Sequence, residues 1–130
     1  MQRHTILVVE DIADILKVVR GILSREKTYD VRCATSAVSG LKLGTSLPGP
    51  IHLLIANVML NGTFGSDLAQ KLRVARPQMK VILLDGKGLE DIRILDRAVS
   101  QGWGLIEKRF IREELMIRVR NELKGAGATG

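Results

Sequence analysis

Five polar side chains stand at the carboxyl ends of apolar runs in this chain. Glu10 and Asp11 follow TILVV, Asn57 follows IHLLIA, Asp85 follows KVILL, and Lys108 follows GLIE. The amide of Asn57 is neutral and delocalised, and its nitrogen is a poor nucleophile. Asn57 can therefore ligate through its carbonyl oxygen, but it cannot attack an electrophile. The carboxylates and the ammonium group can hold ions or charged ligands, provided that the fold brings them together.

The elements that must position these residues alternate along the chain. Five β-branched or aliphatic runs read as strands, at 5–9, 29–34, 51–56, 80–84 and 104–107. Segments with helical spacing follow them, at 12–23, 36–47, 68–75, 92–99 and 111–123. Gly40 and Gly44 weaken the second helix, and Pro77 ends the third. Five repeats of strand and helix predict an α/β domain whose parallel sheet is covered on both faces.

In such a sheet, ligands bind beyond the carboxyl ends of the strands, near the point where the strand order reverses. The five polar residues follow four of the predicted strands, so we expect them to face one crevice. With three acids and one lysine, the crevice has a formal charge of −2. This convergence is more specific than any one residue.

The composition limits the classes of protein to which this chain can belong. With 130 residues, 45% of them hydrophobic, the chain predicts one compact domain over residues 1–124. The remaining tail, 125–130, has no core-forming residue and is expected to be flexible. No apolar run approaches the roughly 20 residues that span a bilayer. Cys33 is the single cysteine and cannot form an internal disulfide, which fits a reducing cytoplasm.

The net charge of +6 raises the question of nucleic-acid binding. The excess of positive charges is two in residues 1–50, three in 51–87 and one in 88–130, so it is spread along the chain. The aromatic residues available for stacking, besides Tyr29, are few: Phe64, Trp103 and Phe110. Surfaces that track phosphates concentrate their charge, so this pattern argues against nucleic acid as a partner.

The segments ILVVEDIADIL, LLIANVMLNGTFG, VILLDG and LIEKRF, taken in order, resemble the receiver domain of bacterial response regulators. The resemblance covers about residues 4 to 124. It implies a single-domain flavodoxin-like (βα)5 fold, a three-layer sandwich with strand order 2-1-3-4-5. Members of this family bind Mg²⁺ and transfer a phosphoryl group from a histidine kinase to one of their own aspartates.

The resemblance assigns roles position by position. Glu10 and Asp11 match the acidic pair that holds the metal. Asn57 stands where the family has the phosphorylated aspartate, and Met59 stands where a backbone carbonyl completes the metal shell. Lys108 matches the lysine of the phosphate site. The resemblance thus implies a weak or vestigial Mg²⁺ site made of Glu10, Asp11, Asn57 and Met59.

Other positions depart from the family pattern. Asp85 replaces the hydroxyl residue that grips the phosphoryl group, and Leu105 replaces the aromatic switch residue. Arg109 and Asn61 replace common prolines, whereas Gly65 matches the glycine before the third helix. An aspartyl phosphate needs a carboxylate nucleophile, so no phosphorylation is expected at residue 57. We expect Asp85 to pair with Lys108 and help fill the phosphoryl space; the alternative is that Asp85 faces solvent.

These features predict a receiver domain in two-component signalling that acts as a protein-interaction module without phosphorylation, not as an enzyme. A sensor histidine kinase or output protein would bind the 88–123 face, near the four arginines Arg93, Arg97, Arg112 and Arg118, which also suit a homodimer. No membrane partner is expected. Two alternatives stay open: phosphorylation of another carboxylate, Asp85 or Asp11, with Mg²⁺, or a basic DNA-associated accessory protein.

For several other residues, the sequence can be interpreted without any chemical role. His4 and His52 lie near strand starts, away from the crevice, and lack the spacing of metal ligands. The triplet Asn61-Gly62-Thr63 matches a glycosylation acceptor but reads as a turn in a cytoplasmic chain. Trp103 could anchor a partner or pack a loop.

Overall fold

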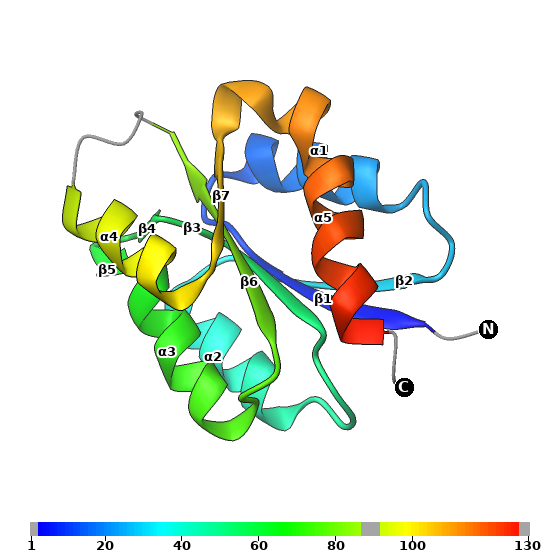
Figure 1. The fold of residues 1–130 in the computed structure, drawn as a ribbon, viewed down its shortest axis with the longest axis horizontal. Helices are drawn as coiled ribbons and strands as arrows, with labels where there is room; N and C mark the ends of the chain where they lie inside the picture. Colours follow the sequence, from blue (N-terminus) through cyan, green and yellow to red (C-terminus); the bar gives the residue numbers. More distant parts are fainter. Residues whose placement is uncertain (1–2, 87–91, 128–130) are drawn as a thin grey trace.

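The computed structural model describes residues 3–86 and 92–127, in a five-stranded parallel sheet with helices on both faces (Figure 1). The elements run in this order: β1 His4–Val9, α1 Ala13–Leu23, β2 Tyr29–Ala34, α2 Ala37–Ser46, β3 Leu53–Asn57, β4 Met59–Leu60, β5 Thr63–Phe64, α3 Gly65–Ala75, β6 Lys80–Asp85, α4 Ile92–Gln101, β7 Gly104–Glu107, a 3₁₀ turn Lys108–Phe110 and α5 Ile111–Gly127. The strand order is β2-β1-β3-β6-β7. Because β4 and β5 form a separate small hairpin, this is the predicted 2-1-3-4-5 order of the five main strands, and the flavodoxin-like fold is confirmed.

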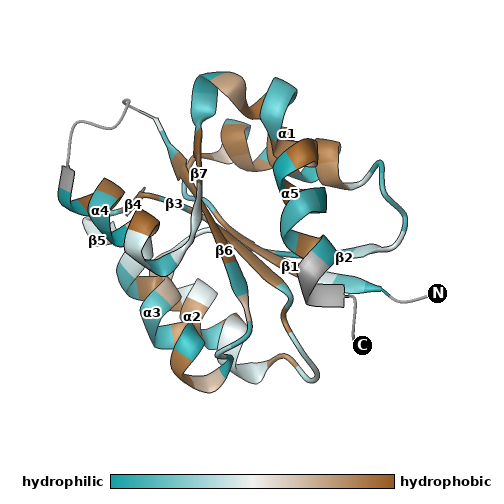
Figure 2. Cartoon of the chain, in the orientation of Figure 1, coloured by the Kyte–Doolittle hydropathy of each residue, from teal (hydrophilic) through white to brown (hydrophobic). Residues whose placement is uncertain are grey.

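Alternate residues of the central strands point to opposite faces of the sheet, and each face builds its own core. In β1, Ile6 and Val8 pack with α1 and α5, whereas Leu7 and Val9 pack with α2 and α3. Figure 1 shows α1 and α5 on one side of the sheet and α2, α3 and α4 on the other. In Figure 2, hydrophobic residues dominate the central strands β1, β3 and β6, while the helices carry many hydrophilic residues. This near-continuous apolar content is typical of strands buried on both faces.

The helix over 36–47, which its glycines made the least certain, is formed. Ser36 accepts a hydrogen bond from the backbone N–H of Ser39, and the Ser39 hydroxyl reaches back to Ser36, so a capping box begins α2. The glycines allow close packing: a Cβ on Gly40 would lie 2.8 Å from Val9 Cγ2, and one on Gly44 would lie 2.6 Å from Leu72 Cδ2. The residues that lower helix propensity therefore let α2 approach the sheet and α3.

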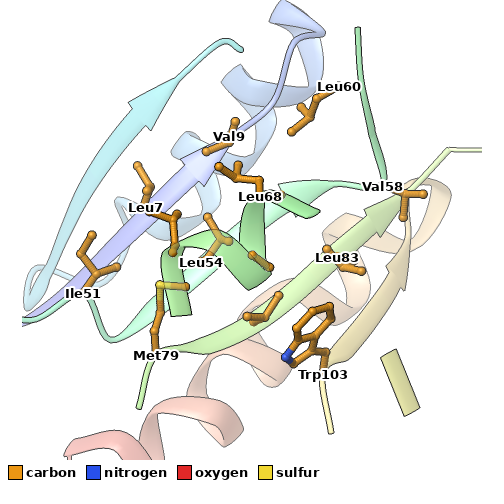
Figure 3. Packing of buried hydrophobic residues seen from close by; sticks show 14 of the residues in the cluster. Leu7, Val9, Ile51, Leu54, Val58, Leu60, Leu68, Met79, Leu83 and Trp103 are labelled. Carbon is orange, nitrogen blue, oxygen red and sulfur yellow. The ribbon is translucent and has the colours of Figure 1, made fainter. Parts of the chain in front are cut away.

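Trp103 and His52 both have structural roles in the fold. Trp103 is buried in the core on the α2, α3 and α4 side (Figure 3), so packing is its role in this structure. His52 accepts a hydrogen bond through Nδ1 from the backbone N–H of Thr5, at 2.9 Å, and its ring lies edge-on to that of His4. Both histidines are at the amino ends of strands, as expected.

The helix α5 reaches Gly127, into the predicted tail; residues 128–130 lie outside the described part of the chain.

Candidate functional site at the carboxyl ends of the strands

The predicted crevice is built by neighbouring strands that end at the same level. Val9 pairs with Ala56 across β1 and β3, Asn57 pairs with Leu84 across β3 and β6, and Asp85 pairs with Glu107 across β6 and β7. This register places the residues that follow each strand along one edge of the sheet. Glu10, Asp11, Asn57 and Lys108 are joined there by hydrogen bonds.

The Asn57 side chain lies between the two acids of the site. Its amide Nδ2 donates to Glu10 Oε1 at 3.0 Å and to Asp11 Oδ1 at 3.1 Å. Asn57 is 6% exposed and Glu10 is fully buried, so these bonds lie largely away from water. Burying carboxylates together is costly unless donors satisfy them. The amide of Asn57 supplies such donors, which the carboxylate of an aspartate could not.

Lys108 completes this cluster from the other side of the sheet centre. Its Nζ donates to Glu10 Oε1 at 3.2 Å and lies 3.1 Å from Oε2. The side chains are 10% and 0% exposed, so this is a buried ion pair. Among the described residues, the structure shows Lys108 paired with an acid that follows β1, whereas the sequence predicted a pair with Asp85. Because β3 and β6 lie between β1 and β7, this pair joins residues that follow two strands that are not neighbours in the sheet.

The acids differ in protonation preference. Burial raises the pKa of Glu10 above its ordinary value, although the backbone N–H of Ile12 and the charge of Lys108 act to lower it. For Asp11, burial also acts upward, but hydrogen bonds from Asn57 and from backbone groups outweigh it, and the pKa of Asp11 is lowered. The lowered pKa favours the ionised form of Asp11, whereas the raised pKa makes Glu10 easier to protonate. The contribution of Ile12 is a backbone N–H, which no side-chain pattern could have indicated.

The remaining predicted site residues, Asp85, Leu105 and Met59, differ in how deeply they are buried. Asp85 ends β6 and is 8% exposed, so the alternative in which it merely faces solvent is wrong. Leu105 is partly buried and packs against the core on the α2, α3 and α4 side. Met59 begins the β4–β5 hairpin with its side chain exposed. The hairpin directly follows the strand that carries Asn57.

Gly65 begins α3 and secures the loop after Asn57. A Cβ added there would collide with the backbone carbonyl oxygen of Asn57, which cannot move aside. The Gly65 N–H also donates to the Val58 carbonyl at 2.8 Å. The match of Gly65 to the glycine before the third helix therefore has a physical reason in this chain: only glycine lets α3 start so close to the site loop.

The residues of the site can be tested for fit to Mg²⁺ by their donors. A hard cation needs oxygen ligands, and here the amide nitrogen of Asn57, not its carbonyl oxygen, faces both acids. Glu10 is already paired with Lys108. Over residues 3–86 and 92–127, no group of three or more His, Cys, Asp or Glu side chains is arranged to hold a metal ion. As arranged, these residues fit an internally hydrogen-bonded cluster and do not fit a cation cage.

The predicted partner face, 88–123, carries charged and apolar side chains. Arg97 forms an ion pair with Asp67 of α3 at 2.9 Å, and Arg118 lies 3.7 Å from Glu114 on its own helix. Exposed apolar side chains are present on both helices, Val99 on α4 and Ile117 on α5. The start of this face, residues 88–91, lies outside the described part of the chain.

Known proteins resemble this chain over nearly its full length. The family model described as "Response regulator receiver domain" matches residues 6–120. An uncharacterized transcriptional regulatory protein of Bacillus subtilis (strain 168), YkoG, is 31% identical over 130 residues, which are 98% of this chain and 54% of that protein. The chain thus spans about half the length of this curated relative.

Solved structures agree with the fold. A receiver domain from Clostridium thermocellum has a TM-score of 0.84 at 24% identity, covering 98% of this chain and 99% of that one. The signal receiver domain of an HD domain-containing protein from Pseudomonas fluorescens Pf-5 has a TM-score of 0.85 at 25% identity, with coverage of 98% and 99%. Within the described residues, no helix is both long and apolar enough to cross a membrane.

Proposed function

This chain belongs to the response regulator receiver domain family, and on that premise we propose that it works in two-component signalling as a protein-interaction module that does not depend on phosphorylation. Receiver domains are regulatory domains and not enzymes in the usual sense. The proposal rests on the asparagine at position 57 and on the hydrogen bonds of its side chain. Its amide cannot accept a phosphoryl group, and its two donors already satisfy Glu10 and Asp11.

Two further positions support a site that holds one state. Asp85 places a buried carboxylate where the family has a neutral hydroxyl, and it would repel an incoming phosphoryl group. Leu105 has no aromatic ring or hydroxyl to move toward such a group. With Lys108 held by Glu10, the parts that respond to phosphorylation in the family are either replaced or already engaged.

We assign partner binding to the 88–123 face, formed by α4, β7 and α5. The occupant would be a sensor histidine kinase or an output protein, or a second copy of this chain. Exposed Val99 and Ile117 offer apolar contact, and arginines such as Arg112 offer charge to an acidic surface. A cytoplasmic location goes with this role. Burial raises the pKa of the Cys33 thiol, which disfavours the reactive thiolate form.

Mg²⁺ binding is expected to be weak, in the millimolar range or absent. A cation would have to turn the Asn57 amide over and compete with Lys108 for Glu10. It would then gain two carboxylates and one neutral oxygen, which is less charge than three carboxylates would supply. Titration calorimetry measures this directly, and a micromolar dissociation constant would contradict it.

The test of the proposed function is intact-protein mass spectrometry after incubation with acetyl phosphate and Mg²⁺. We expect no mass gain, because no carboxylate occupies position 57. A gain of one phosphoryl group that hydroxylamine removes would instead favour phosphorylation of another carboxylate, and peptide mapping would distinguish Asp85 from Asp11. The DNA-associated alternative predicts binding that falls steeply with salt, for which a fluorescence anisotropy titration with duplex DNA is the check.

A further inference from the structure

The hairpin that follows Asn57 turns at an exposed Asn-Gly pair. Leu60 pairs with Thr63, and Asn61 and Gly62 form the turn between them. Asn61 has φ of 48° and Gly62 has φ of 85°, so both lie in the left-handed region that Asn-Gly turns favour. Both residues are exposed. A Cβ placed on Gly62 would find no atom within 4 Å apart from its chain neighbours, so the space beside Gly62 is open.

We propose that Asn61 is a site of spontaneous deamidation, through which the loop beside the acid cluster acquires a new carboxylate. The Gly62 backbone nitrogen, after losing its proton to solvent base, attacks Asn61 Cγ and forms a C–N bond. The C–N bond of the side-chain amide then breaks, and ammonia leaves with a proton from water. Water opens the resulting succinimide at either carbonyl, giving aspartate or isoaspartate at position 61. No oxidant or cofactor takes part.

Asn61 is set apart from the other two asparagines of the chain by its surroundings. The Asn57 amide is buried and bonded to two carboxylates, and the next residue, Val58, is β-branched and shields the backbone nitrogen. Asn121 lies inside α5, where helical geometry holds the following nitrogen away from the side chain, and Glu122 follows it. Only at Asn61 does a residue without a side chain follow an exposed amide.

The change would reach the site through the backbone. The backbone of Asn61 is one of the groups that lower the pKa of Asp11, so a new charge at residue 61 would lie near that carboxylate. Isoaspartate would also add a methylene to a two-residue turn, whose length sets the pairing of Met59 with Phe64. The proposal needs only the hairpin and not the absence of phosphorylation, so it stands or falls separately from the proposed function.

The experiment is to incubate the folded 130-residue chain in mildly alkaline buffer and to follow the amides by peptide mass spectrometry. Asn57 and Asn61 share one tryptic peptide, residues 43–71, so fragmentation must localise the change; Asn121 lies in a separate peptide, 121–124. A parallel sample unfolded in urea gives the rate without the fold. The Asn61→Asp variant provides a reference spectrum for one of the two products.

We expect Asn61 to lose its amide in the native protein, with aspartate and isoaspartate both formed, while Asn57 and Asn121 keep theirs. The rate should rise with pH, because the attacking nitrogen must lose a proton. If Asn61 stays intact in the native chain but is lost in urea, the folded hairpin protects it and the proposal is wrong. Loss at Asn57 as fast as at Asn61 would overturn it equally, since burial and bonding would then offer no protection.

Discussion

At the scale of single residues, Asn57 differs from an aspartate in what it gives to its neighbours. Its amide donates to Glu10 and Asp11, whereas a carboxylate at that place would accept and repel. The same substitution that removes the nucleophile therefore also removes a need for a cation to hold the acids together. One change in residue type accounts for both properties.

Asn57→Asp should destabilise the protein in the absence of divalent cations. Two donors are lost and a third carboxylate is buried, for which we expect a cost of about 1–3 kcal/mol in the free energy of unfolding. Mg²⁺ should recover part of this cost by binding the folded state. Urea denaturation with and without Mg²⁺ measures both effects.

Asn121→Asp is the matched control for that measurement, because it makes the same charge change at an exposed position of α5. It should alter stability by no more than about 0.5 kcal/mol and should not respond to Mg²⁺. Equal stability of Asn57→Asp and the parent chain in EDTA would show that the two amide hydrogen bonds contribute nothing.

His52 makes folding stability sensitive to acid at the opposite end of the sheet. Burial, with the nearby His4 ring, lowers its pKa below 6.5, and its Nδ1 must stay unprotonated to accept from the Thr5 N–H. A lowered folded-state pKa means that stability is fully present above the unfolded pKa and is lost as the pH falls through the folded one. We expect the melting temperature to drop as the pH is taken below about 6.

His52→Asn tests this dependence, because an amide oxygen can replace Nδ1 as acceptor without titrating. Melting curves over a pH series should show a smaller acid-induced drop for the variant than for the parent chain. The ring of His4 contacts both His52 and Tyr29, so a His4→Asn variant is needed beside it. An unchanged pH profile in His52→Asn would contradict the role given to His52.

At the scale of elements, we predict opposite changes in stability for the same Gly→Ala substitution at two helix positions. Gly21 lies inside α1 with nothing within 4 Å of its Cβ position, whereas Gly65 starts α3 against the backbone of Asn57. Gly21→Ala should stabilise the protein by about 0.5–1 kcal/mol through helix propensity. Gly65→Ala should destabilise it by about 2–4 kcal/mol, since the backbone must move.

Chemical denaturation of the two variants compares the same substitution in two settings. A stabilising Gly65→Ala would mean that the start of α3 can shift away from the site loop. In that case the loop after Asn57 would not be held in place by the close approach seen here.

At the scale of the whole molecule, the residues of the proposed degenerate site follow four strands, and the loss of phosphorylation that we propose should be reversible. The fold, the acid pair and Lys108 remain, so Asn57→Asp combined with Asp85→Thr restores the nucleophile and the hydroxyl together. We expect the double variant to gain one phosphoryl group from acetyl phosphate with Mg²⁺, in a form that hydroxylamine removes.

The single variants serve as controls in that experiment. Asp85→Thr alone should stay unmodified, because Asn57 still lacks a nucleophile, and Asn57→Asp alone should react more slowly than the double variant. A double variant that remains inert would show that the site is impaired beyond these two positions, with Leu105 and the Glu10–Lys108 pair as the next residues to change.

The sequence by itself determined the succession of strands and helices along the chain and the placement of polar residues after the strands, because the alternation of apolar periods indicates both. The sheet order 2-1-3-4-5 was expected only from the resemblance to receiver domains. It also predicts that residue 57 does not accept a phosphoryl group, since that expectation follows from residue type alone. The second helix was less certain, because the value of Gly40 and Gly44 lies in contacts with Val9 and Leu72 that no local propensity records.

Only the tertiary structure decided which charges meet. Lys108 pairs with Glu10 across 98 residues of sequence, and Asn57 joins Glu10 and Asp11 across 47 and 46. Residue types show that such groups can attract one another, but the register and depth of the strands select the partners. Asp85 illustrates the same limit: its burial depends on neighbours from other elements, so the choice between a solvent-facing and a buried carboxylate lay outside the reach of the sequence.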